Sequence, residues 1–118
     1  MTGYSTIVLL FFCVAVVSAV NPTQRLCGVP AGECGYGSCT GKACPDLYPG
    51  YKSQWPKLKG VSAVAAKNII ERDNPFVKAW IYPEGFLFTS IICSKRVILL
   101  TPKNDCPNGR VTNSPYVG

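Results

Sequence analysis

Six of the seven cysteines fall in the part of the chain that can fold, and they constrain it more than any other feature. They form an early group of four and a later pair: Cys27, Cys34, Cys39, Cys44, Cys93 and Cys106. An even number in so short a chain is typical of three disulfides formed in an oxidising compartment. A zinc site would use close Cys or His pairs, but the chain has no histidine and no CxxC motif. We therefore expect disulfides, with no metal and no cofactor.

The seventh cysteine, Cys13, belongs to an apolar run that does not look like part of a fold. Residues 7–17 are continuously apolar and are followed by the small residues Ser18 and Ala19. This pattern predicts a secretory signal peptide over residues 1–19. A membrane anchor needs about 18 or more apolar residues, and polar residues from Asn21 onward end this run too early. We expect a secreted, extracellular protein without membrane attachment after cleavage.

The remaining residues divide by composition into an extension and a domain. Residues 20–54 are rich in Gly, Pro and Cys and show no helical or strand periodicity, so they need disulfides to hold a shape. From Trp55 the apolar residues take regular spacings, which predicts one domain over residues 55–118. Ser62 is a candidate N-cap for a helix of about eleven residues that Pro75 terminates.

Two strands follow the helix. Residues 77–82 alternate between two faces until Pro83, and residues 96–101 are an apolar run that predicts a strand buried on both faces. No tight turn joins them, which favours a parallel pair. The predicted fold class is α+β: a small sheet with a parallel strand pair packed on one helix, an exposed binding loop, and a disulfide-rich irregular N-terminal segment.

The connection between the strands, residues 83–95, is a long loop for so small a domain, and such loops are usually functional. It is also strongly apolar, through Phe86, Leu87, Phe88, Ile91 and Ile92. One interpretation makes these residues a further buried strand, and the other makes them an exposed binding patch. The two interpretations predict opposite exposures for Ile91.

Several short motifs in a fixed order carry a resemblance to a known family. They are Trp55-Pro56-x-Leu58-x-Gly60, the Asn74-Pro75 helix stop, Pro83-x-Gly85, Thr89, Arg96-Val97 and Pro115-x-Val117-Gly118. Residues 55–118 resemble the potato inhibitor type I, or eglin-like, serine-protease inhibitors, with an insertion of about four residues near 102–110. Nothing in residues 20–52 matches this family closely.

The resemblance implies that the loop enters a protease cleft as a substrate would. It makes Ser90 the P1 residue and Ile91 the P1′ residue. The implied reactive-site loop and its supports are Phe88, Thr89, Ser90, Ile91, Ile92, Arg96, Cys93 and Gly118. Because Ser90 is small and neutral, we expect an elastase-like or subtilisin-like serine endopeptidase as partner, and an inhibitor that is monomeric.

The loop supports depart from the family pattern. Members brace the loop with two arginines, which bond the P2 threonine and an acidic P1′ residue. Arg96 fills the first position, with Thr89 as its expected partner, but Ile98 fills the second and Ile91 fills P1′. Donor and acceptor are missing together, so neither is left unpaired. Cys93 is the candidate replacement, since a disulfide just past the scissile bond would restrain the loop.

The reach of the chain limits which cysteines can pair. A strand from Cys93 to Thr101 rises about 26 Å, and five more residues to Cys106 recover at most about 17 Å. A bond between these two cysteines needs Cα atoms closer than about 7 Å and is therefore disfavoured. Each should join one of the four early cysteines, leaving two of those to pair together. Cys44 is favoured for Cys93, because it lies nearest the Trp55 segment.

Two other functions stay open, while an enzyme is disfavoured. The chain has no histidine, no GxSxG motif and no paired acids at catalytic spacing. Its net charge of +6 comes from dispersed basic residues, which gives little support for nucleic-acid or membrane binding. The alternatives are a cationic defence or toxin-like protein, and a non-inhibitory interaction module on the same scaffold.

Overall fold

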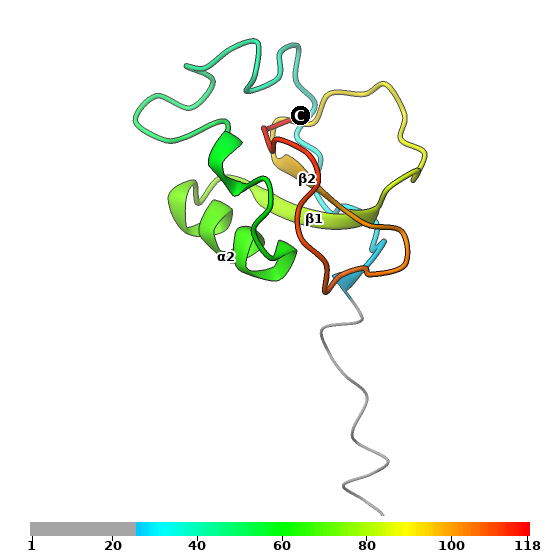
Figure 1. Cartoon of the computed structure of the whole chain (residues 1–118). Coiled ribbons are helices and arrows are strands. Elements are labelled where there is room, and N and C mark those ends of the chain that lie inside the picture. The colour runs from blue at the N-terminus through cyan, green and yellow to red at the C-terminus, as the bar shows by residue number, and fades with distance from the viewer. Residues whose placement is uncertain (1–25) are drawn as a thin grey trace, which may run out of the picture.

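The computed structural model describes residues 26–118, so the predicted signal peptide and the first residues of the extension lie outside it. A short 3₁₀ helix, η2 (Pro56–Leu58), precedes the helix α2 (Ala63–Asp73) and the strands β1 (Lys78–Pro83) and β2 (Arg96–Thr101). Figure 1 shows α2 beside the sheet and the loop 83–95, in yellow, arching away from it. The α+β class and the parallel strand pair are confirmed. Within the described range, no helix is both long and apolar enough to cross a membrane.

Helix α2 forms where its sequence places apolar residues three and four apart. Ala63, Ala66 and Ile70 are fully buried along one stripe and pack into the core. Ser62 directly precedes the helix, as predicted, but its side chain makes no capping hydrogen bond. The N–H of Ala63 instead donates to the carbonyl of Gly109 at 3.0 Å. A later part of the chain therefore satisfies one of the helix-end donors, although not one that an N-cap serine would bind.

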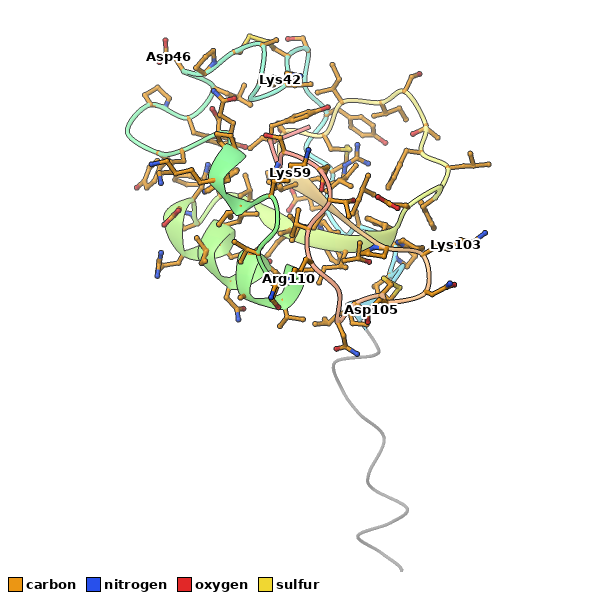
Figure 2. The ribbon with its side chains drawn as sticks, viewed as in Figure 1. Lys42, Asp46, Lys59, Lys103, Asp105 and Arg110 are labelled. Carbon is orange, nitrogen blue, oxygen red and sulfur yellow. A yellow bond between two sulfur atoms is a disulfide. The ribbon has the colours of Figure 1, made fainter. Side chains whose placement is uncertain are left out.

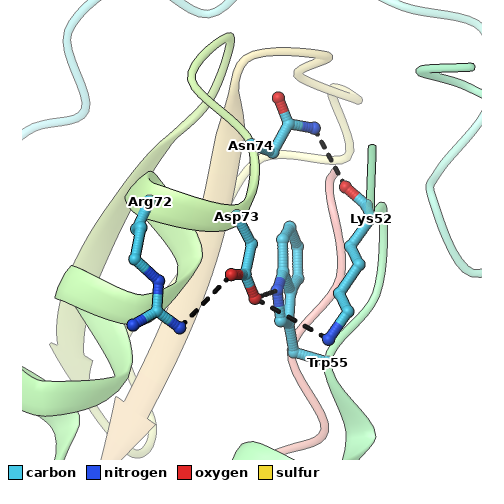
Figure 3. Close-up of polar contacts among 5 residues, drawn as sticks. All are labelled: Lys52, Trp55, Arg72, Asp73 and Asn74. Atoms are coloured by element: carbon cyan, nitrogen blue, oxygen red, sulfur yellow. Dashed lines mark hydrogen bonds and ion pairs between the residues drawn. The ribbon is translucent and has the colours of Figure 1, made fainter. Parts of the chain in front are cut away.

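The C-terminal end of α2 is fixed to the segment before η2 (Figure 3). Asn74 is fully buried, and its amide donates to the Lys52 carbonyl at 2.9 Å, while its side-chain oxygen accepts the Phe76 N–H at 3.0 Å. The indole N–H of Trp55 donates to the Asp73 carboxylate at 3.1 Å. A buried asparagine with both its groups bonded holds the helix end in one place.

The sheet places β1 and β2 in parallel, with Lys78 opposite Arg96 and Pro83 opposite Thr101. Val97, Leu99 and Thr101 of β2 are buried, but the alternate residues Arg96, Ile98 and Leu100 are only half-buried. The prediction that β2 is buried on both faces is therefore wrong. Only one face packs into the core, and Ile98 and Leu100 line a hollow beneath the loop instead.

Both edges of the two-stranded sheet are covered by other parts of the chain. The C-terminal segment lies along β2, where Gly118 donates to the Arg96 carbonyl at 2.8 Å and Val117 bridges Val97. On the β1 side, Gly28 of the extension donates to the Ile81 carbonyl at 2.8 Å. Covered edges protect the sheet from pairing with another molecule.

Three disulfides connect the extension to the domain and to itself. They join Cys27 to Cys106, Cys34 to Cys93, and Cys39 to Cys44. Each later cysteine pairs with an early one, as the reach of the chain predicts. The predicted Cys44–Cys93 pair is wrong, because residues 34–37, and not residues near Cys44, lie alongside the end of the loop.

Candidate functional site

The loop between β1 and β2 presents its middle to solvent. Leu87 is 92% exposed and Ile91 is 45% exposed, while Thr89 and Ser90 are also exposed. Exposure falls after them, since Ile92 is half-buried and Cys93 is buried. The buried-strand interpretation is therefore wrong for this segment, and the apolar residues form an exposed patch.

The loop leaves β1 through a tight turn. The N–H of Phe86 donates to the Pro83 carbonyl at 3.1 Å, and Gly85 has a φ of 84°. A positive φ at the third residue is the geometry of a type II turn, which glycine adopts without strain. The N–H of Glu84 donates to the Thr101 carbonyl at 2.8 Å, so the turn is attached to the end of β2.

Three aromatic rings support the first half of the loop. Tyr82, at the end of β1, has its ring centroid 4.6 Å from that of Phe86 and 4.9 Å from that of Phe88. The rings of Phe86 and Phe88 lie 4.9 Å apart. Tyr82 is buried, and that burial raises the pKa of its hydroxyl. The cluster holds Phe88, two residues before Ser90, against the body of the protein.

Arg96, the first residue of β2, supports the loop at the predicted position but through a different partner. Its Nη2 donates to the carbonyl of Ile91 at 3.2 Å, and its Nε donates to the carbonyl of Gly118 at 2.8 Å. The expected hydrogen bond to Thr89 is absent between these two described residues. The guanidinium carbon also lies 6.0 Å from the Phe88 ring centroid. One side chain therefore links both halves of the loop to the C-terminal segment.

The second half of the loop is joined to the extension by the predicted disulfide at Cys93, and also by backbone pairing that the sequence did not predict. Gly37 donates to the Ile92 carbonyl at 3.1 Å, and Ser94 donates to the Gly35 carbonyl at 2.7 Å. The Cys34–Cys93 disulfide lies beside this short antiparallel ladder. A Cβ on Gly35 would lie 2.6 Å from a side-chain carbon of Lys95, so glycine allows this close approach. The Gly-Tyr-Gly sequence after Cys34 was the one feature of the sequence that could have indicated a close backbone approach here.

Hollows lie on both sides of the loop. One, of about 470 Å³, is lined by Ser90, Ile91, Arg96 and Ile98. The apolar Ile98 thus faces the space where the family pattern places its second arginine. The other hollow, of about 340 Å³, lies between the loop and residues 28–36 of the extension. The loop is therefore supported at its ends and from one strand, and its middle stands clear of the protein.

The charged groups of the molecule are not gathered at the loop. Figure 2 shows Lys42, Lys59, Lys103 and Arg110 on separate parts of the surface. The loop residues 85–93 carry no ionisable side chain apart from the disulfide-bonded cysteine. Among residues 26–118, no group of three or more His, Cys, Asp or Glu side chains could hold a metal ion. The loop therefore offers an exposed and uncharged peptide surface.

Comparisons with known proteins place this architecture in a family. The model of the Potato inhibitor I family matches residues 48–118. An inhibitor of trypsin and Hageman factor from Cucurbita maxima is 44% identical over 67 residues, covering 57% of this chain and 93% of the relative. The crystal structure of a bitter gourd trypsin inhibitor has a TM-score of 0.52 at 37% identity, covering 58% of this chain and 94% of that one.

The matched range includes η2, α2, both strands, the exposed loop and Arg96, and it leaves out most of the extension. Because this match spans more than half of the chain and the relatives are covered almost completely, the protein belongs to the Potato inhibitor I family, a family of protease inhibitors and not of enzymes.

Proposed function

We propose that this chain is a secreted, monomeric inhibitor of a serine endopeptidase that offers the Ser90–Ile91 bond as a substrate would. The observation that carries the proposal is an exposed peptide segment supported on both sides of that bond. Phe88 packs in the aromatic cluster before it. Arg96 holds the Ile91 carbonyl, and the Cys34–Cys93 disulfide fixes the chain after it.

Rigidity accounts for inhibition in place of digestion. A flexible substrate loses conformational freedom when it docks, whereas a loop already held in shape retains that free energy as affinity. Extended backbone pairs with the enzyme through main-chain hydrogen bonds, and the P1 side chain enters the specificity pocket. If the Ser90–Ile91 bond is cut, both new ends stay attached to the protein, so they remain poised to rejoin.

The identity of the P1 residue directs the choice of target. The two relatives are named as trypsin inhibitors, and a trypsin-like pocket selects a cation at P1. Ser90 is neutral and small. It fits the shallow pocket of an elastase-like enzyme or the tolerant cleft of a subtilisin-like one. We therefore assign the target to these classes and not to the trypsin-like class.

The test is titration of the purified mature protein against elastase, subtilisin, chymotrypsin and trypsin, followed by mass analysis. We expect tight inhibition of elastase or subtilisin and a slow single cut between Ser90 and Ile91. Ser90→Lys should move inhibition to trypsin, while Asn68→Lys, which adds the same charge on the exposed side of α2, should not. Inhibition of trypsin alone by the unmodified protein would refute the assigned P1 residue.

The same titration, together with a vesicle-leakage assay, separates the competing functions. Rapid cutting at Ser90–Ile91 without inhibition would identify a non-inhibitory module on this scaffold. Failure to inhibit any of the four enzymes, together with release of dye from anionic vesicles, would instead favour a cationic membrane-active protein.

A further inference from the structure

The most exposed aromatic side chain among the described residues belongs to the extension and not to the loop. Tyr36 is 81% exposed, although it lies between two glycines whose backbone is firmly held. Gly35 accepts a hydrogen bond from Ser94, and Gly37 donates one to Ile92. One exposed aromatic ring is ordinary on a protein surface. A ring that extends an exposed apolar patch, as Tyr36 extends that of Leu87 and Ile91, is characteristic of a binding surface.

Tyr36 lies directly beside the primed side of the loop. It is paired with Cys93 in the antiparallel ladder, and Cys93 is the third residue after the Ser90–Ile91 bond. Residues paired in this way have Cα atoms about 5 Å apart. Tyr36 also lines the 340 Å³ hollow together with Leu87, Thr89 and Ile91 of the loop. An enzyme that accepts the loop therefore comes to lie next to this ring.

We infer that the extension supplies a second contact for the same protease, with Tyr36 as its anchor against the enzyme surface bordering the primed side of the cleft. This inference rests on the proposed function and extends it beyond the loop. The partner that covers Tyr36 is the protease itself. The apolar surface around Tyr36 is continuous with Leu87 and Ile91, which are both exposed residues of the loop.

The energetics favour a tyrosine in this place. Tyrosine is enriched among the few residues that dominate binding energy, because it covers a large area with only two side-chain torsions to fix. The backbone beneath Tyr36 is already fixed by the Cys34–Cys93 disulfide and by the backbone bonds of its neighbours. Docking therefore orders little more than one ring, and the contact contributes almost fully to affinity.

The experiment compares Tyr36→Ala and Tyr36→Phe with the unmodified protein, using elastase and subtilisin. Against the enzyme that the unmodified protein inhibits, Tyr36→Ala should raise the inhibition constant about tenfold, mostly through faster dissociation. Tyr36→Phe keeps the ring and should stay within about threefold of the unmodified protein. Tyr51→Ala is the matched control, because Tyr51 is also an exposed extension tyrosine but packs against Phe76.

A second measurement distinguishes contact from support. The rate of cutting at Ser90–Ile91 reports loop rigidity and the melting temperature reports the stability of the whole fold, and neither should change in Tyr36→Ala. An unchanged inhibition constant in Tyr36→Ala, with the unmodified protein inhibiting, would overturn this inference and leave the proposed function standing. A raised constant accompanied by faster cutting would also overturn it, because Tyr36 would then act on the loop and not on the enzyme. If the unmodified protein inhibits neither enzyme, the proposed function and this inference fall together.

Discussion

At the scale of single residues, Arg96 makes the contact that most directly determines the shape of the loop. Its guanidinium bonds the carbonyls of Ile91 and Gly118, which no other described side chain reaches. In Arg96→Ala both bonds are lost. With about 1 kcal/mol for each bond, the inhibition constant should rise roughly tenfold or more. Cutting at Ser90–Ile91 should also become faster, as measured by mass spectrometry over time.

Arg110→Ala is the control for the loss of an arginine. Arg110 also donates to a carbonyl, that of Gly60 at 2.9 Å, but it does so away from the loop. Its removal should leave both the inhibition constant and the cutting rate unchanged. Equal effects in the two variants would show that Arg96 acts through general charge or stability and not through the loop carbonyl.

Gly41 lies between the C-terminal segment and the end of the extension at Ser53. Its N–H donates to the Val117 carbonyl at 2.7 Å, and a Cβ there would lie 2.1 Å from the backbone oxygen of Ser53. Backbone cannot move aside as a flexible side chain can. Gly41→Ala should therefore lower the free energy of unfolding by about 3 kcal/mol, measured by urea unfolding with the disulfides intact.

Gly50→Ala provides the comparison. Gly50 has a φ of +85°, but a Cβ there meets no atom within 4 Å. The substitution adds backbone strain alone, so the free energy of unfolding should fall by about 1 kcal/mol. A loss for Gly41→Ala no greater than this would show that Gly41 is not packed tightly against the backbone of Ser53.

At the scale of elements, the extension acts as a brace for the loop through one disulfide in particular. Cys34–Cys93 closes a sequence separation of 59 residues and lies just after the proposed Ser90–Ile91 reactive bond. Replacing both cysteines with serine should remove about 4 kcal/mol of stability in the loop-closure model. The loop should then be cut much faster at Ser90–Ile91, because its second half loses its covalent support. Cutting rate and inhibition constant are the measurements.

The Cys39–Cys44 disulfide supplies the matched variant. It closes a separation of only 5 residues within the extension, so its removal should cost about 2 kcal/mol. Its loss should leave cutting at the loop unchanged. If both double-serine variants were cut at the same rate, stability in general, and not the covalent hold on Cys93, would govern resistance to proteolysis.

The sequence predicts the bounds of the helix and strands better than it predicts which residues contact one another. The strand β2 has the predicted bounds because the pattern of residues 96–101 is local, and helix α2 ends before Pro75 as predicted. The partner of Cys93 was not predictable, since chain reach excludes Cys106 but does not say where an irregular extension turns. The hydrogen bond from Arg96 to Ile91 was not predictable either, because its acceptor is a backbone carbonyl and every residue has one.

At the scale of the whole molecule, the charged and apolar surfaces have separate roles. The loop is uncharged from Gly85 to Ile92, while the net charge of +6 is spread over the rest of the chain. In the proposed complex, short-range contact at the loop therefore determines how slowly the protease dissociates. The field of the whole molecule acts at longer range and determines how quickly a protease of opposite charge arrives.

This separation predicts how salt changes the kinetics with a serine protease of net negative charge. Raising the salt from about 20 mM to about 500 mM should lower the association rate constant severalfold and leave the dissociation rate constant within about twofold. Lys57→Glu lowers the net charge by two at an exposed position in η2 that lines neither hollow beside the loop. It should slow association at low salt and leave dissociation unchanged. A dissociation rate that rose with salt would mean that charged groups contact the enzyme directly, so the basic residues nearest the loop, Lys42 among them, would then belong to the interface.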